Sequence, residues 1–231
     1  MFPLSDENPT DLKPIGTSVL ITGCILTWIV LQNGGFSSQA LLSSICKFGT
    51  IPVEVTGNAG VGIESSPCQI GGYSWQTLFS SIFLHGSWLH LIGNVWFLWI
   101  FGNNIEDAMG HWRFLLFFVF TGVMASLVHT LSQPNSALPM VGASGAISGV
   151  MGAYLVLYPR ARIRTLLILG YAVTITPIPA WVFLGIWTLI QMFGSTANPV
   201  GGEGGVAYMA HIGGLCAGLL LVLLFRKPLK E

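Results

Sequence analysis

The chain has 231 residues, of which 8% are charged and 52% are hydrophobic, and its mean hydropathy is +0.72. Soluble domains carry roughly 25% charged residues, so this composition excludes an ordinary soluble domain. It also excludes a disordered chain, because such chains are rich in charge and poor in apolar residues. The nine basic and nine acidic residues cancel, which leaves no basic field for nucleic acid. The composition therefore predicts a protein that crosses a membrane several times.

Uncharged apolar stretches of about 20 residues mark the predicted membrane spans. We expect an all-α polytopic bundle with six transmembrane helices, at residues 16–31, at the end of the run 78–101, and at 112–131, 142–158, 180–193 and 206–225. Pro177 and Pro179 interrupt the region before the fifth span, so residues 165–179 are expected to be irregular.

The predicted spans divide the chain into four parts. These are a short N-terminal tail (1–15), a first transmembrane helix with a long outside loop (16–77), a helical core (78–225) and a C-terminal tail (226–231). The outside loop holds Cys46 and Cys68, which can pair as a disulfide in an oxidising compartment or remain free. Cys24 and Cys216 lie inside predicted spans and are expected to be packing residues.

The distribution of basic residues predicts the orientation, because Lys and Arg accumulate on the cytoplasmic side. With the N-terminus in the cytoplasm, Lys47 alone falls outside and eight of the nine basic residues fall inside: Lys13, Arg113, Arg160, Arg162, Arg164, Arg226, Lys227 and Lys230. Both termini are therefore predicted to be cytoplasmic. The acidic first 15 residues make a poor signal peptide, so we expect the first span to be retained, in an integral multi-pass protein of a prokaryotic plasma membrane.

Charged residues are absent from the deep parts of the predicted spans. This disfavours an aspartyl protease or a charged relay, and the H-E-x-x-H string of membrane zinc proteases is missing. His85 and His90 have no acid or Cys at ligand spacing, so no metal site is expected.

Histidine, asparagine and serine are the polar residues that the spans do contain. His90 and Asn94 are spaced i, i+4 and share one face of the second span. Ser144 opens the fourth span, and His211 lies near the outer end of the sixth. The predicted orientation brings His90, Ser144 and His211 to the same outer depth of the membrane.

Two small-residue patterns show how these side chains can meet. Gly145 and Gly149 form G-x-x-x-G on the fourth span, and Gly214 and Gly218 form another on the sixth. Glycines let helix backbones approach closely. A close crossing would bring the short side chain of Ser144 within reach of an imidazole.

Taken singly, these residues have ordinary explanations, since a lone Ser in a helix bonds a carbonyl one turn back and a lone buried His usually packs. Together they match a serine hydrolase, with Ser144 as nucleophile and His211 as base. His90, Asn94 and the Ser144 N–H, which is free at a helix start, would be the donors to the oxyanion. Because no carboxylate is available, a dyad is expected rather than a triad.

Three strings resemble the rhomboid family of intramembrane serine proteases over about residues 78–225. They are His85-x4-His90-x3-Asn94, Gly142-x-Ser144-Gly145 and Ala210-His211-x-Gly213. They occur in the family's order on its second, fourth and sixth helices, and residues 102–114 resemble its segment after the second helix.

The resemblance implies a six-helix core whose active site opens to the outside through a water-filled cavity. It implies a Ser144–His211 dyad that uses no cofactor, and an oxyanion hole of His90, Asn94 and the Ser144 backbone. Gly142 and Gly145 would support the nucleophile, and His85 would lie near the cavity rim. The implied partners are membrane lipid and single-span membrane proteins, which the family cuts near the outer end of the span.

Two positions depart from patterns found in relatives. Some relatives carry an aromatic four residues after the nucleophile, where this chain has Ser148, so another residue must hold His211. Many carry Trp-Arg in the first outside loop, where this chain has Trp75 and Gln76.

Two alternatives stay open at this point: a catalytically silent rhomboid-like protein that binds membrane clients, and a small-solute channel or transporter. The five glycines within residues 194–205 also suggest a mobile cap over the site, with an ordinary solvated loop as the alternative. The oligomeric state is left open.

Overall fold

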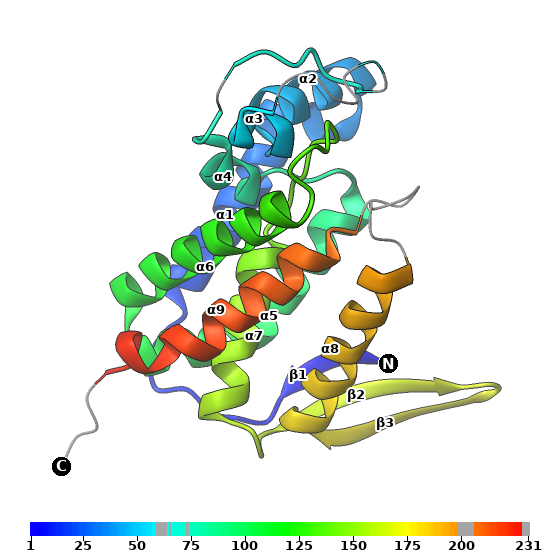
Figure 1. Cartoon of the computed structure of the whole chain (residues 1–231). Coiled ribbons are helices and arrows are strands. Elements are labelled where there is room, and N and C mark those ends of the chain that lie inside the picture. The colour runs from blue at the N-terminus through cyan, green and yellow to red at the C-terminus, as the bar shows by residue number, and fades with distance from the viewer. Residues whose placement is uncertain (59–63, 65, 73, 198–205, 228–231) are drawn as a thin grey trace.

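The computed structural model describes residues 1–58, 64, 66–72, 74–197 and 206–227 (Figure 1). Its long helices form a bundle with α7 at the centre, packed against α5, α6, α8 and α9. The bundle helices are α1 (Ile15–Leu26), continued by a π-helical turn η1 (Thr27–Leu31), α5 (Trp88–Met109), α6 (His111–Ser132), α7 (Ser144–Leu157), α8 (Ala180–Ala197) and α9 (Tyr208–Phe225).

The helices differ in how well they meet the requirements of a membrane crossing. Among the described residues, α6 and α9 are long and apolar enough, whereas the apolar helices at Ile15–Leu31, Ser144–Leu157 and Ala180–Thr196 are shorter. The 14 residues of α7 extend about 21 Å at 1.5 Å per residue, less than the roughly 30 Å of a hydrocarbon core. The count of six spans therefore stays a prediction.

The apolar run 78–101, which the second predicted span ends, is not one helix. Its first residues form the short α4 (Thr77–Ser80) and η4 (Ser81–Phe83), and α5 begins later and runs on to Met109. The helix starts there because Ser87, in an extended conformation, caps it by accepting a hydrogen bond from the His90 N–H at 3.2 Å.

The protein is mostly helical, as predicted, but it also contains a three-stranded antiparallel sheet, which an all-α fold would lack. The expected irregular stretch is a hairpin of β2 (Arg162–Leu169) and β3 (Ala172–Pro179), and β1 (Phe2–Asp6) pairs with β2. Gly170 takes the positive φ of +61° that the tight turn needs. Pro177 and Pro179 prevent a helix, while the Val, Ile and Thr residues beside them favour a strand.

The predicted N-terminal tail, 1–15, is bound to the bundle. Asp6 Oδ2 accepts hydrogen bonds from the Tyr154 hydroxyl and from Asn104 Nδ2, both at 2.8 Å. Burial raises the pKa of Asp6 above its ordinary value, and these hydrogen bonds oppose the rise. The strand β1 is thereby attached to α5 and α7.

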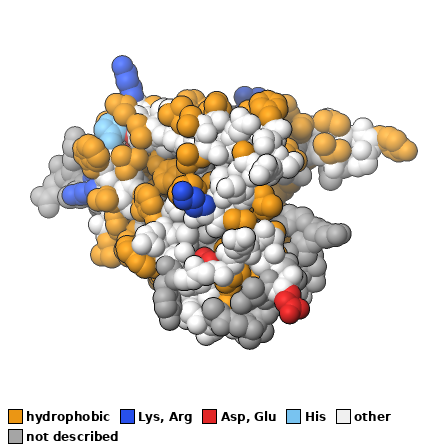
Figure 2. Space-filling view, turned by 90° about the horizontal axis from the view of Figure 1, so that it is seen from above, with side chains coloured by type: hydrophobic (Ala, Val, Ile, Leu, Met, Phe, Trp, Pro, Cys, Tyr) orange, Lys and Arg blue, Asp and Glu red, His pale blue; other side chains and the backbone are white. Residues whose placement is uncertain are grey.

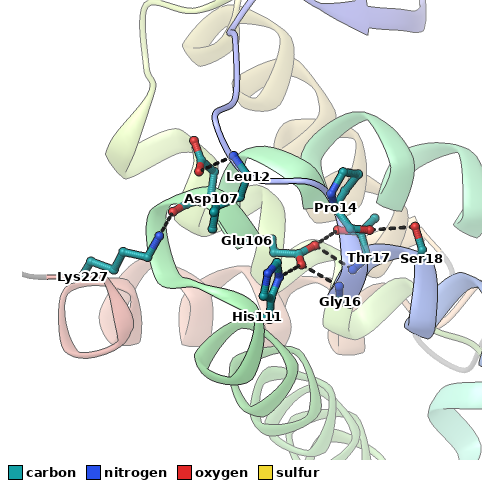
Figure 3. A network of polar contacts seen from close by, with 9 residues as sticks. All are labelled: Leu12, Pro14, Gly16, Thr17, Ser18, Glu106, Asp107, His111 and Lys227. Carbon is teal, nitrogen blue, oxygen red and sulfur yellow. Dashed lines mark hydrogen bonds and ion pairs between the residues drawn. The ribbon is translucent and has the colours of Figure 1, made fainter.

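A fully buried carboxylate, Glu106, holds the start of α1 (Figure 3). It accepts hydrogen bonds from the backbone N–H of Gly16 at 2.6 Å and of Thr17 at 2.8 Å, from the Thr17 hydroxyl at 2.8 Å, and from His111 Nδ1 at 2.5 Å. The first N–H groups of a helix have no intrahelical acceptor. A negative charge there interacts favourably with the positive end of the helix dipole. Glu106 therefore fixes α1 to the junction of α5 and α6.

The same junction binds both ends of the described chain. The Asp107 carboxylate accepts from the backbone N–H groups of Asp11 and Leu12, each at 3.1 Å. Lys227, after α9, donates from its backbone N–H to Ala108 O at 2.9 Å and from Nζ to Asp107 O at 2.8 Å. Both ends thus lie at one end of the bundle, as an even number of crossings requires, while their cytoplasmic location stays a prediction.

The predicted long outside loop contains α2 (Ser38–Phe48) and α3 (Pro52–Thr56), at the opposite end of the bundle from the sheet (Figure 1). A disulfide joins Cys46 to Cys68, with Cα atoms 5.3 Å apart. Cys24 is buried as expected, but Cys216 is exposed on α9.

Glu106→Gln is expected to lower the free energy of unfolding by about 2 kcal/mol, because hydrogen bonds to a buried charge are lost and an amide N–H₂ would face N–H donors. Equilibrium unfolding in mixed micelles measures the change. Glu7→Gln, the same replacement at an exposed side chain, is the control. Equal stability of the two variants would contradict the role of Glu106.

Candidate functional site

Ser144 and His211 are in hydrogen-bonding contact. Ser144 is the first residue of α7, and His211 lies in the first turn of α9. Ser144 Oγ lies 2.7 Å from His211 Nε2, and the other ring nitrogen, Nδ1, lies 2.7 Å from Gln191 Oε1 on α8. Three helices therefore converge on one imidazole.

Glycine makes the contact between α7 and α9 possible. A Cβ on Gly214 would overlap the carbonyl oxygen of Gly145, and a Cβ on Gly218 would overlap that of Gly149. The two predicted G-x-x-x-G patterns thus face each other, and the prediction of a close crossing is confirmed. Any larger residue would separate the helix ends that carry Ser144 and His211.

The turn before Ser144 also requires glycine. Gly142 has φ +129°, and its N–H donates to Ser81 O at 2.9 Å. A Cβ at Gly142 would lie 2.7 Å from His90 Nε2 and 3.7 Å from Asn94 Nδ2. The absent side chain therefore leaves room for two polar nitrogens beside the backbone that leads into the helix.

Those nitrogens have the chemistry of hydrogen-bond donors. Asn94 Nδ2 is buried and finds no partner in the part of the chain that the structure describes. His90 Nδ1 accepts from the Gly86 N–H at 3.4 Å, so a neutral ring carries its proton on Nε2. The Ser144 N–H, at the helix start, has no intrahelical acceptor.

Two cavities reach this group of residues. One, of about 670 Å³, lies under the loop before α7 and is lined by residues that include Met140, Gly142 and Ala207. The other, of about 240 Å³, lies beside α5 and α8 and is lined by residues that include Asn94 and Trp187. Both are lined by His90, Ser144 and His211, so the serine faces open space in both cavities.

The segment between α2 and α3 supports the loop that precedes Ser144, a connection that sequence analysis missed. Thr50 and Met140 exchange backbone hydrogen bonds of 2.9 and 2.8 Å. The Thr50 hydroxyl also bonds Thr77 O at 2.8 Å and Ser81 Oγ at 2.9 Å. Ser81 in turn accepts from Gly142, so these contacts lead to the turn at the nucleophile.

His85, which the resemblance places near the cavity rim, does not itself line either cavity. Its side chain is fully buried. The side-chain amide of Gln32 bonds its backbone twice, at 2.6 and 2.8 Å. Its ring packs edge-on against His90, with centroids 5.2 Å apart. His85 therefore packs against the His90 ring from the buried interior.

Trp187 and Gln191 contact His211, as an aromatic at position 148 would in some relatives. Ser148 is buried and donates to the Ser144 carbonyl at 2.6 Å. The Trp187 ring instead lies 5.8 Å from the His211 ring, at an interplanar angle of 35°. The available signal was a Gln four residues after a Trp in an uncharged span, which places both on one helix face.

Two further points concern the expected surroundings of the site. Residues 198–205, most of the predicted cap, lie outside the described residues. In the described part of the chain, no group of three or more His, Cys, Asp or Glu is placed to hold a metal ion.

A family model described as a rhomboid domain matches residues 72–228. The chain belongs to the rhomboid family. Rhomboid-like protein 11, chloroplastic, of Arabidopsis thaliana is 32% identical over 160 residues, which are 67% of this chain and 54% of that protein. Rhomboid protease GluP of Bacillus subtilis (strain 168) is 32% identical over 206 residues, 89% of this chain and 34% of that protein.

Rhomboid-like protease 5 of Toxoplasma gondii is 37% identical over 143 residues, 60% of this chain and 15% of that protein. This rhomboid chain thus spans about half or less of the length of these three relatives. Rhomboids are membrane-embedded, and the proteases among them are serine proteases, so the bundle is that of a membrane protein.

Gly214→Ala is expected to destabilise this rhomboid by about 1–3 kcal/mol, the cost of overpacking a tight contact. Equilibrium unfolding in mixed micelles measures the change. Gly185→Ala on α8 is the matched control, because nothing lies within 4 Å of the added Cβ. A Gly214→Ala variant as stable as Gly185→Ala would show that α7 and α9 do not cross as closely as described.

Proposed function

We propose that this rhomboid is an intramembrane serine endopeptidase that cleaves single-span membrane proteins near the outer end of their span. The observation that carries the proposal is the 2.7 Å contact between Ser144 Oγ and His211 Nε2. Relatives named as proteases support it. The same proposal includes six spans, cytoplasmic termini and a prokaryotic plasma membrane. The site lies at the end of the bundle opposite the chain ends, so cytoplasmic termini would place it on the outer side.

Gln191 selects the tautomer of the imidazole that the reaction needs. A neutral imidazole carries one N–H. When Nδ1–H donates to Gln191 Oε1, Nε2 is left free to accept the Ser144 proton. The Trp187 ring, next to the imidazole, restricts its rotation. Gln191 is therefore a positioning residue that does in neutral form what the carboxylate does in a triad.

The reaction then follows from the geometry. Ser144 Oγ attacks the peptide carbonyl while His211 Nε2 takes its proton. The tetrahedral oxyanion is stabilised by Asn94 Nδ2, His90 Nε2 and the Ser144 N–H. His211 next gives the proton to the leaving amine, and water entering through the larger cavity hydrolyses the acyl-enzyme.

Ser144→Ala and His211→Ala are each expected to abolish both cleavage of a single-span substrate and labelling by a fluorophosphonate, because the nucleophile or its base is lost. Ser148→Ala, which removes another buried hydroxyl one turn away, keeps both activities. Gel fluorescence of labelled protein in detergent is the measurement. Labelling that persists without Ser144 would sink the proposal, and a wild-type protein that never labels would favour the silent client-binding alternative.

Asn94→Ala is expected to lower kcat about a hundredfold, the usual effect of removing one oxyanion donor. KM for a membrane substrate stays near its original value, because the donor acts on charge that develops in the transition state. Steady-state cleavage in liposomes separates the two constants. A change confined to KM would place Asn94 in substrate binding instead.

Variants at position 191 test the role of the amide through the pH profile. Gln191→Glu places a carboxylate beside His211 and stabilises its protonated form, so the acid limb of the kcat profile moves to higher pH. Gln191→Leu lowers kcat without moving that limb in the same direction. Identical pH profiles for the wild type and Gln191→Glu would mean that residue 191 does not contact the catalytic imidazole.

A further inference from the structure

The β2–β3 hairpin projects sideways from the bundle, at the end where the chain ends meet (Figure 1). It connects α7 to α8, two helices of a membrane-embedded family. At its base Ile163 is buried in the bundle core, and Ile178, opposite it, packs against the same core. The base of the hairpin is thus fixed to the bundle, while the part near the turn extends past it.

The projecting part carries no charge and exposes large apolar side chains. Residues 165–179 contain no Asp, Glu, Lys or Arg. Ile168 and Val173 are each 65% exposed, Ile175 is 50% exposed, and Tyr171 at the turn is fully exposed. Seen from above, the projecting arm is mostly hydrophobic (Figure 2). Leaving such an arm in water costs about 25 cal/mol for each Å² of apolar surface.

The register separates the hairpin into an apolar tip and a basic base. Leu166 pairs with Ile175 and Ile168 pairs with Val173, whereas Arg162 and Arg164 pair with the prolines near the bundle. Arg160, before β2, adds a third cation, and all three arginines are exposed. An apolar tip beside a group of arginines complements the acyl chains and phosphates of an anionic bilayer surface.

The backbone limits how deep the hairpin can lie. The outer edge of β3 pairs with no described strand, so its N–H and C=O groups need water or headgroups. Pro177 has no N–H to satisfy, which reduces the demand near the base. Tyr171, at the turn, is a side chain that favours the membrane–water interface. These features fit the headgroup region and not the hydrocarbon centre.

We propose that the hairpin tip, residues 166–175, lies in the headgroup region of an anionic lipid bilayer, with Arg160, Arg162 and Arg164 on the lipid phosphates. Because α8 begins directly after β3, this contact holds the helix that carries Trp187 and Gln191. The proposal rests on the hairpin and on the membrane location of the family. Its test does not require protease activity.

Spin-label accessibility in the full chain tests the proposal. A label at Tyr171→Cys, in a Cys24→Ala, Cys216→Ala background that keeps the disulfide, is compared with one at Glu7→Cys, an exposed residue at the same end of the bundle. In nanodiscs containing phosphatidylglycerol, we expect the label at 171 to meet oxygen more than a water-soluble nickel chelate, and the label at 7 to show the reverse. Equal nickel accessibility at the two positions would overturn the proposal.

The same labels distinguish an anionic surface from other partners. Arg162→Gln and Arg164→Gln are each expected to reduce the immersed population about fivefold, the worth of one cation near an anionic surface. In nanodiscs of pure phosphatidylcholine, the immersed population of the chain without these Arg substitutions is expected to be smaller than in phosphatidylglycerol. Immersion that is the same in both lipids would refute the role of the arginines. Dipolar broadening between labels at 171 would show that a second copy covers the tip, and would also overturn the proposal.

Discussion

The close crossing of α7 and α9 is the constraint on which the candidate site depends. At two successive turns the glycines of α9 lie against carbonyl oxygens of α7 with no space for a methyl group. This contact brings the first residue of one helix to the first turn of the other, and so joins a hydroxyl to an imidazole. The other groups of the site, from α5, α8 and the loop at Gly142, are arranged around that pair.

The opposite end of the bundle holds these helices in place. In the last turn of α5, Glu106 contacts the start of α1 and Asp107 contacts the N-terminal segment. Lys227, the second residue after α9, bonds the same turn. Asp6 joins β1 to α7 through Tyr154. The helices that carry His90, Ser144 and His211 are therefore fixed at the end remote from the site, while the disulfide-linked segment fixes the loop beside it.

Much of the site could be predicted from residue type and spacing. His90, Asn94, Ser144 and His211 stood out because polar groups are costly in apolar spans, and the glycine patterns indicated which helices would meet. Gln191 and Trp187 were missed because their partner, His211, lies 20 or more residues further along the chain. The burial of His85 could not be predicted because it depends on contacts between distant parts of the chain, such as the bonds from Gln32, 53 residues earlier, to its backbone. The hairpin was missed because short apolar runs near prolines do not reveal whether a strand partner exists.

The sequence by itself determined that the chain is a membrane protein and that two of its helices can approach closely, because these follow from composition and from the spacing of residues along single helices. The rhomboid family was indicated by the resemblance of three separated motifs, and not by composition or periodicity. The tertiary structure alone decided which side chains contact the His211 imidazole, where α5 begins and that the N-terminal segment forms a strand. Each of these depends on the distance between atoms far apart in the chain, and that distance is set by packing.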